Sequence, residues 1–182
     1  MKITPLILTL LITSASLAQT LYITRNGQIS FFSKTPMENI DATNNEVTSM
    51  INSTTGEMVY AVLIKSFRFE RALMEEHFNE NYLESDKFPK ATFSGKIINS
   101  DKIDFSKSGN YQANVEGELT IHGIKKPISS TGTITISGNK LSANSMFSIR
   151  LADYDIKIPS LVADKISETI DIKVNCEYQP KQ

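Results

Sequence analysis

The sequence predicts an all-β protein: a closed antiparallel β-barrel of about eight strands with one substantial helix. The strongest observation is segment 110–149, in which three runs alternate apolar and polar residues and are joined at His122-Gly123 and Gly138-Asn139. Such alternation puts apolar side chains on one face of each strand. Strand-like runs on both sides, without a strand–helix–strand rhythm, favour antiparallel pairing. We favour a barrel over a sandwich because strands with one apolar face can close around side chains or one ligand.

The strand-like runs before the helix are 21–24, 28–34, 40–51 and 58–64. Asn26-Gly27 readily adopts the positive φ of a tight turn, which predicts a hairpin between the first two runs. Either Asn44-Asn45 or 53–56 is expected to reverse the chain before the fourth run. That fourth run is apolar almost throughout, which indicates a strand covered on both faces.

One helix is predicted, from Arg71 to about Tyr82. Apolar and aromatic residues recur there at helical spacing, with acidic residues and asparagines between them. The helix should end before Pro89, because the residue preceding a proline is pushed out of the helical region. We expect it to lie against the sheet or to close one end of it. Strands resume at 91–98, and the last strand, 169–178, again alternates cleanly.

The first 18 residues have the pattern of a secretory signal peptide. Lys2 supplies a positive charge, a mostly apolar stretch runs from Ile3 to Leu17, and small residues precede a cleavage point after Ala18. The apolar stretch is too short to span a membrane comfortably, and no second one follows. We therefore expect residues 19–182 to form one exported domain, periplasmic or secreted, with no transmembrane span.

The composition argues against a nucleic-acid-binding protein, and the single cysteine is expected to be structural. The formal net charge is −1 at pH 7, and basic residues are not clustered as a nucleic-acid surface requires. Cys176 lies on the apolar phase of the last strand. We expect it to be a small buried hydrophobe rather than a reactive thiol, because free cysteines are among the most buried residues.

No sequence motif indicates catalysis, a metal or a cofactor. His77 and His122 lack metal-ligand spacing, so we expect His77 to pack at the apolar edge of the helix and His122 to be solvated. Asp153 and Asp155 form a pair without the glycine and distal glutamate of a calcium loop. The protein is therefore not expected to be an enzyme.

Three segments carry a resemblance to a known family. The most specific is 117–128, Gly-Glu-Leu-Thr-Ile-His-Gly-Ile-Lys-Lys-Pro-Ile, and the others are 78–93 and 148–156. In this order they resemble the YceI-like proteins that bind lipids or polyisoprenoids. Asp155 stands where that family usually has glycine, and a charge near a barrel mouth would bear on which head group is accepted.

The resemblance implies a lipocalin-like barrel, usually periplasmic, that holds a long isoprenoid, quinone or comparable lipid and has no catalytic residues. Burial of a chain of roughly twenty carbons would contribute on the order of 16 kcal/mol, at about 0.8 kcal/mol per methylene. Association costs about 4 to 15 kcal/mol. An apolar lining alone can therefore give useful affinity.

The side chains expected to contact such a lipid are apolar residues on the inward phase of the strands and helix. They are Val62, Ile64, Phe67, Phe78, Phe93, Tyr111, Val115, Leu119, Ile134, Leu141, Phe147, Ile170 and Ile172. The pattern does not separate a ligand-lined interior from one filled by side chains. The alternative is therefore a filled barrel that acts through its outer surface as a stress-related interaction or structural protein. The identity of the lipid and a homodimeric state stay open.

Overall fold

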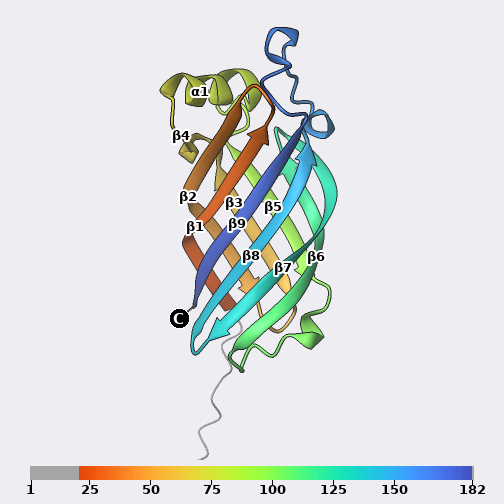
Figure 1. Ribbon diagram of the computed structural model, residues 1–182. Helices are drawn as coiled ribbons and strands as arrows, with labels where there is room; N and C mark the ends of the chain where they lie inside the picture. The colour runs from red at the N-terminus through yellow and green to blue at the C-terminus, as the bar shows by residue number, and fades with distance from the viewer. Residues whose placement is uncertain (1–20, 182) are drawn as a thin grey trace, which may run out of the picture.

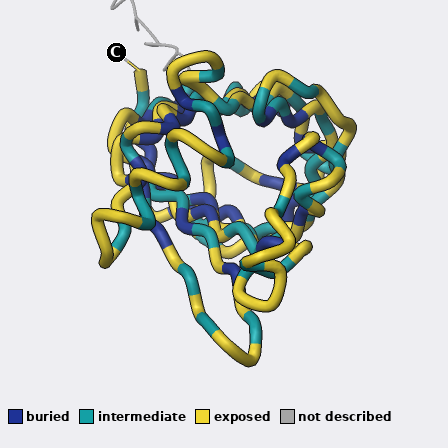
Figure 2. Tube along the Cα trace, turned by 90° about the horizontal axis from the view of Figure 1, so that it is seen from above, coloured by how far each residue is buried: buried dark blue, intermediate teal, exposed yellow. Residues whose placement is uncertain are grey.

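Eight strands wind into a closed antiparallel barrel in the computed structural model, which describes residues 21–181 (Figure 1). Pairing of the first two strands completes the ring, and the view along the axis shows the chain encircling an interior (Figure 2). The predicted fold class is therefore confirmed. The strands are β1 (Leu21–Lys34), β2 (Asn39–Asn52), β3 (Glu57–Leu63), β5 (Lys90–Ile97), β6 (Gly109–Ile121), β7 (Ile124–Ser137), β8 (Lys140–Arg150) and β9 (Thr169–Pro180).

The predicted helix is present as α1 (Ala72–His77), followed without a break by the π-helical turn η2 (Phe78–Tyr82). It lies across one end of the barrel, beside the two-residue strand β4 (Arg68–Phe69), which pairs with β2 (Figure 1). The described part of the chain also contains four short 3₁₀ turns: η1 (Ile64–Ser66), η3 (Ser100–Lys102), η4 (Leu151–Tyr154) and η5 (Ser160–Val162). Within residues 21–181, no helix has the length and hydrophobicity needed to cross a membrane.

The hairpin predicted at Asn26-Gly27 is wrong. Strand β1 runs through this dipeptide, with irregular register against β2 on either side of Gly27. A Cβ atom at Gly27 would lie 2.5 Å from the Cys176 sulfur, so the glycine serves close packing of β1 against β9. Sequence alone does not distinguish a glycine at a bulge from a glycine in a tight turn, because both positions favour glycine for its missing side chain.

Asn44-Asn45 also lies inside a strand, and the chain reverses at the other predicted position, 53–56. The Asn44 side chain is fully buried; its amide donates to the Leu63 carbonyl at 2.8 Å, and its oxygen accepts from the Glu46 amide at 2.8 Å. Gly56, with φ of +75°, supplies the left-handed conformation at the true reversal. The predicted meander is confirmed as β6, β7 and β8, with positive φ at both His122 and Gly123.

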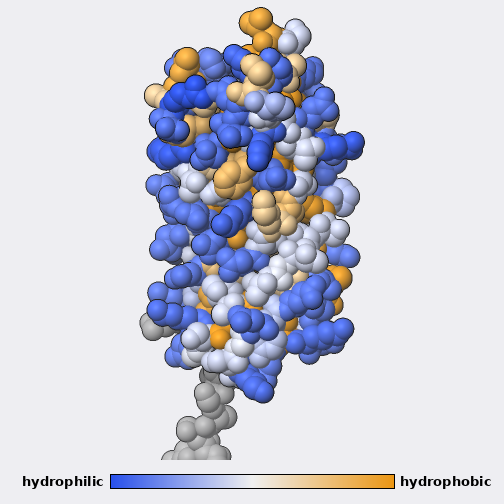
Figure 3. Space-filling view, viewed as in Figure 1, coloured by the Kyte–Doolittle hydropathy of each residue, from blue (hydrophilic) through white to orange (hydrophobic). Residues whose placement is uncertain are grey.

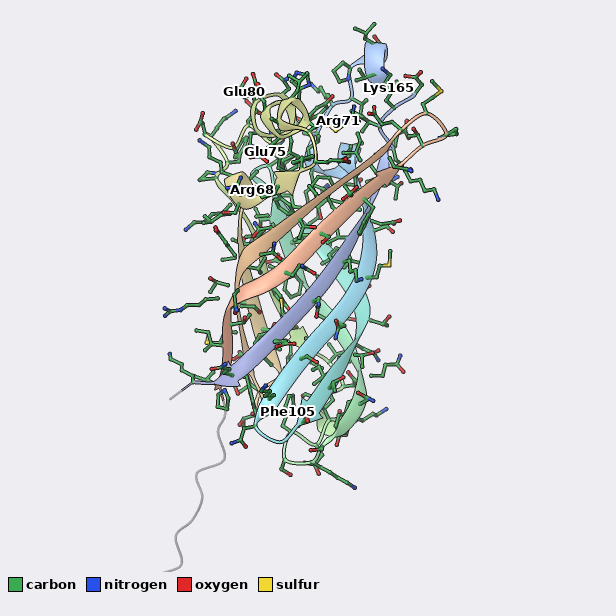
Figure 4. All side chains as sticks on the ribbon, turned by 60° about the vertical axis from the view of Figure 1, so that its left-hand side comes forward. Arg68, Arg71, Glu75, Glu80, Phe105 and Lys165 are labelled. Atoms are coloured by element: carbon green, nitrogen blue, oxygen red, sulfur yellow. The ribbon has the colours of Figure 1, made fainter. Side chains whose placement is uncertain are left out.

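The barrel interior differs between its two ends. At the end opposite α1, thirteen buried side chains form one packed cluster, and Phe105 packs against it (Figure 4). Cys176 is completely buried in this cluster, as predicted, and burial raises the pKa of its thiol to about 11. On the face seen in Figure 3 the outer surface is mostly hydrophilic, with scattered hydrophobic residues. The apolar phase of the strands therefore points inward.

Candidate functional site

A cavity of about 350 Å³ occupies the half of the barrel nearest α1. Its wall is built mainly from apolar side chains that alternate inward along the strands, with α1, η2 and the segment 151–166 contributing at the mouth. The volume lies within the range of small-molecule sites, which are mostly apolar with few polar groups. The arrangement suits an apolar ligand that needs little directional bonding.

Most of the predicted contact residues line this cavity. They are Val62, Ile64, Phe67, Phe78, Phe93, Val115, Leu119, Phe147, Ile170 and Ile172. Their contact with a ligand stays a prediction.

The other three predicted residues do not line the cavity. Ile134 and Leu141 are 2% and 1% exposed in the packed cluster at the closed end. Tyr111 borders a separate shallow depression, and its hydroxyl donates to the Lys107 carbonyl at 3.0 Å. All three point inward like the lining residues, but they lie further along the barrel axis, toward the end opposite α1. Period-two alternation predicts which face of a strand a residue occupies and not its position along the barrel axis.

Several lining residues escaped prediction. Ile29 and Phe31 lie on the inward phase of β1, within the strand-like run 28–34. Ile156, Val162 and Ile166 come from an irregular segment whose sequence has no periodicity to interpret. Alternation along 28–34 was therefore the signal that could have identified Ile29 and Phe31, and the irregular segment offered no such signal.

Four aromatic rings attach the helix to the barrel rim. The Phe78 ring centroid lies 5.3 Å from that of Phe31, 5.6 Å from that of Phe67 and 5.1 Å from that of Phe69. Phe78 begins the π-helical turn, a local widening that is frequent at functional sites. The cluster closes the barrel beneath α1 with apolar surface.

Polar contacts fix the start of the helix. The Glu75 carboxylate accepts from Arg68 at 2.8 Å and from the Phe69 amide at 3.3 Å, which links α1 to β4 (Figure 4). Arg71 pairs with Glu38 in the β1–β2 turn. Glu38 and Lys165 are charged residues that line the mouth, and Lys165 lies at the helix end of the molecule (Figure 4).

Asp155, noted as a departure from the family pattern, is exposed and does not line the cavity. Its φ is +53°, a left-handed conformation that favours glycine and that aspartate tolerates better than most residues. The structure therefore explains why glycine suits this position.

Three hydroxyl groups meet inside the barrel beside the cavity. Tyr178 donates to Tyr60 at 2.8 Å, Ser49 lies 2.8 Å from Tyr178, and Ser49 donates to the Val59 carbonyl at 2.8 Å. Burial raises the pKa of Tyr60 to about 12 and raises that of Tyr178 as well, so both phenols are neutral near pH 7. Tyr60 lines the cavity, whereas Tyr178 is 1% exposed behind it.

His122 is not solvated, contrary to prediction. Its side chain is 11% exposed and packs edge-on against Phe88, with the ring centroids 4.6 Å apart. Nε2 lies 2.8 Å from the Glu84 carboxylate, and Nδ1 lies 3.1 Å from the Tyr154 carbonyl. The β6–β7 turn is thereby tied to the segment after η2 and to η4. His77 is exposed and lines the mouth.

Among residues 21–181, no group of three or more His, Cys, Asp or Glu side chains is arranged to hold a metal ion. The fold and the cavity define a lipocalin-like class of protein, a closed antiparallel barrel with an apolar chamber beneath a short helix. The YceI-like domain family matches residues 22–178, and the chain belongs to that family.

Curated relatives share a modest part of this sequence. A UPF0312 protein of Pseudomonas putida strain W619 is 27% identical over 103 residues, covering 53% of this chain and 48% of the relative. A UPF0312 protein of Pseudomonas fluorescens strain SBW25 is 25% identical over 130 residues, covering 68% and 62%. The matched region spans about half the length of the P. putida relative.

Solved structures share the fold at low identity. A polyisoprenoid-binding domain from Saccharophagus degradans superposes with a TM-score of 0.78 at 15% identity, covering 90% of this chain and 99% of that one. BcnA of Burkholderia cenocepacia has a TM-score of 0.70 at 15% identity, covering 83% and 95%. The YceI protein of Campylobacter jejuni has a TM-score of 0.57 at 15% identity, covering 100% and 92%.

Proposed function

We propose that this protein holds a long apolar lipid, such as an isoprenoid or a quinone, inside its barrel as a carrier or sequestering protein. The observation that carries this proposal is the largely apolar cavity of about 350 Å³ beneath α1. An empty apolar chamber forgoes the dispersion contacts that a filled one makes, so an apolar occupant is favoured. A structural neighbour described as a polyisoprenoid-binding domain gives further support.

The cavity counts against the alternative of a barrel filled entirely by side chains. Ile134 and Leu141 lie in the packed cluster at the closed end, whereas the half nearest α1 encloses the cavity. Each methylene placed there contributes about 0.8 kcal/mol, so hydrophobic lining supplies the affinity. The proposal includes no catalytic step.

Export is part of the proposal, with the periplasm as the favoured destination. It rests on the signal-peptide pattern of residues 1–18, which lie outside the described residues. N-terminal sequencing of the protein recovered from the periplasmic fraction should begin at Gln19. Recovery of the uncleaved chain in the cytoplasm would contradict export.

Direct identification of the bound molecule tests the binding proposal. Residues 19–182, purified without denaturant, should carry a lipid that organic extraction and mass spectrometry detect in near-stoichiometric amount. Delipidated protein should take up an added isoprenoid alcohol with micromolar or better affinity, about −8 kcal/mol. Absence of both a co-purified lipid and uptake of added lipid would refute the proposal.

A further inference from the structure

The barrel wall is forked between β7 and β8. Pairing of these strands joins Gly132–Ser137 to residues 140–145 and stops there. Beyond it, residues 124–131 of β7 pair with β6, and residues 146–150 of β8 pair with β9 (Figure 1). Pro127 lies in the unpaired part of β7, consistent with the confinement of proline to strand edges.

Two serines lie at the base of this fork and line the cavity. The Ser130 and Ser145 hydroxyl oxygens are 2.8 Å apart, and Ser145 donates to the Thr131 carbonyl at 2.8 Å. The close approach needs Gly132, where a Cβ atom would lie 2.5 Å from the Asn144 carbonyl oxygen. Ser145 thus makes a side-chain bond to β7 where the backbone ladder ends.

Two hydroxyl hydrogens serve three contacts at this pair. The Thr131 carbonyl lies 2.8 Å from Ser145 and 3.3 Å from Ser130, which favours the arrangement in which Ser145 donates to that carbonyl and Ser130 donates to Ser145. A hydroxyl oxygen accepts through two lone pairs, so Ser130 retains the capacity to accept. Its hydrogen can also turn to an incoming oxygen. The pair therefore offers an uncharged donor and acceptor in a largely apolar wall.

The surroundings select an uncharged partner. Ile128 and Phe147 line the cavity beside the serines, and the charged lining residues Glu38 and Lys165 belong to the mouth. Among the residues that line the cavity, none beside the serines carries a positive charge, so a phosphate or carboxylate reaching them from inside the cavity would have no facing cation.

We propose that Ser130 and Ser145 form a polar subsite that binds an uncharged oxygen, such as a hydroxyl or carbonyl, of an otherwise apolar lipid. The inference rests on the proposed lipid-binding function and adds the class of head group and its position in the cavity. It places the oxygen at the fork in the barrel wall rather than at the charged mouth.

Phytol and phytane test this proposal because they share one branched carbon skeleton and differ in a single hydroxyl group. The Ser130→Ala/Ser145→Ala double variant should bind phytol about two- to tenfold more weakly than the unmodified protein, the range of one neutral hydrogen bond. Its affinity for phytane should be unchanged. For each ligand, the affinity of the variant is compared with that of the unmodified protein, so the difference in hydration between phytol and phytane cancels.

Ser148→Ala is the matched control, since Ser148 lies in the same strand and bonds to Asp171 on the outside of the barrel. It should leave both affinities unchanged. Equal weakening of phytol and phytane by the double variant, or no weakening of phytol, would overturn the subsite. Selective loss of phytol binding in Tyr60→Phe, with the serine variant unaffected, would also overturn it. Failure of the unmodified protein to bind either ligand would instead refute the lipid-binding function itself.

Discussion

The hydroxyl of Tyr178 in β9 donates a 2.8 Å hydrogen bond to the hydroxyl of Tyr60 in β3, strands that are not neighbours in the barrel. The bond therefore crosses the interior, where Ser49 lies 2.8 Å from the same Tyr178 oxygen. It lies where the packed end of the barrel meets the cavity, because Tyr60 lines the cavity and Tyr178 belongs to the packed cluster.

Removal of the central hydroxyl should destabilise the fold. Tyr178→Phe removes the hydroxyl that donates to Tyr60, while Ser49 keeps its bond to the Val59 carbonyl. A buried polar group that loses its partner costs about 1 to 3 kcal/mol. Urea denaturation should show that loss. Tyr111→Phe removes a hydroxyl whose partner is the carbonyl of Lys107 near the surface, and should cost less than about 1 kcal/mol. Equal costs for the two variants would argue against a cooperative buried network.

Stability should fall in alkaline solution. Burial raises the pKa of Tyr60 from 10.0 to about 12 and that of Cys176 from 9.0 to about 11. Above the unfolded pKa values the unfolded chain releases these protons first, so the free energy of unfolding decreases as pH rises from about 9 to about 12. Below that range these two groups contribute no pH dependence.

The tyrosine contribution can be isolated by difference. Tyr60→Phe should flatten the decline of the urea midpoint between about pH 10 and pH 12, where a shift of two units corresponds to about 2 to 3 kcal/mol. An identical alkaline slope in the variant and the unmodified protein would assign the decline to other groups.

Filling the cavity should block binding without unfolding the barrel. Val115→Trp places a large ring at the wall of the cavity, so the free energy of unfolding should fall by less than the roughly 1 to 3 kcal/mol that overpacking a filled core costs. Displacing two ligand methylenes, each worth about 0.8 kcal/mol, lowers affinity on the order of tenfold. Fluorescent-lipid titration measures the loss.

Ile134→Val is the converse variant, because Ile134 lies in the packed cluster rather than in the cavity wall. It should cost about 0.5 to 1.5 kcal/mol of stability and leave lipid affinity unchanged. A marked loss of binding in Ile134→Val would show that the ligand reaches the closed end.

Gly27→Ala should destabilise the barrel by about 1 to 3 kcal/mol, the usual cost of overpacking. The added Cβ atom would meet the Cys176 sulfur at 2.5 Å. Cys176→Ala removes that sulfur, so the double variant should be more stable than the sum of the two single effects predicts. Strict additivity of the two changes would place the cost in the β1 backbone instead.

The parts of the fold that the sequence predicted are those set by local periodicity. Alternation along 110–149 predicted three paired strands, helical spacing predicted α1 and η2, and Cys176 on the apolar phase was predicted to be buried. Each follows from the geometry of one element and the burial of its apolar face. The wrong prediction of a turn at Asn26-Gly27 shows where local patterns fail. Gly27 is needed because its backbone packs closely against Cys176, about 150 positions away in sequence.

The sequence by itself determined which side chains face the interior, because a strand alternates with a period of two. Only the tertiary structure decided how far along the barrel each one lies, and so placed Leu119 in the cavity wall and Ile134 in the packed end. It also decided that β7 and β8 separate beyond Ser145 and that His122 is enclosed by Glu84, Phe88 and Tyr154. The physical reason is that all three features depend on how strands distant in sequence are staggered against one another: the position of a side chain along the barrel axis, the parting of β7 from β8 and the burial of His122. No local sequence pattern encodes that stagger.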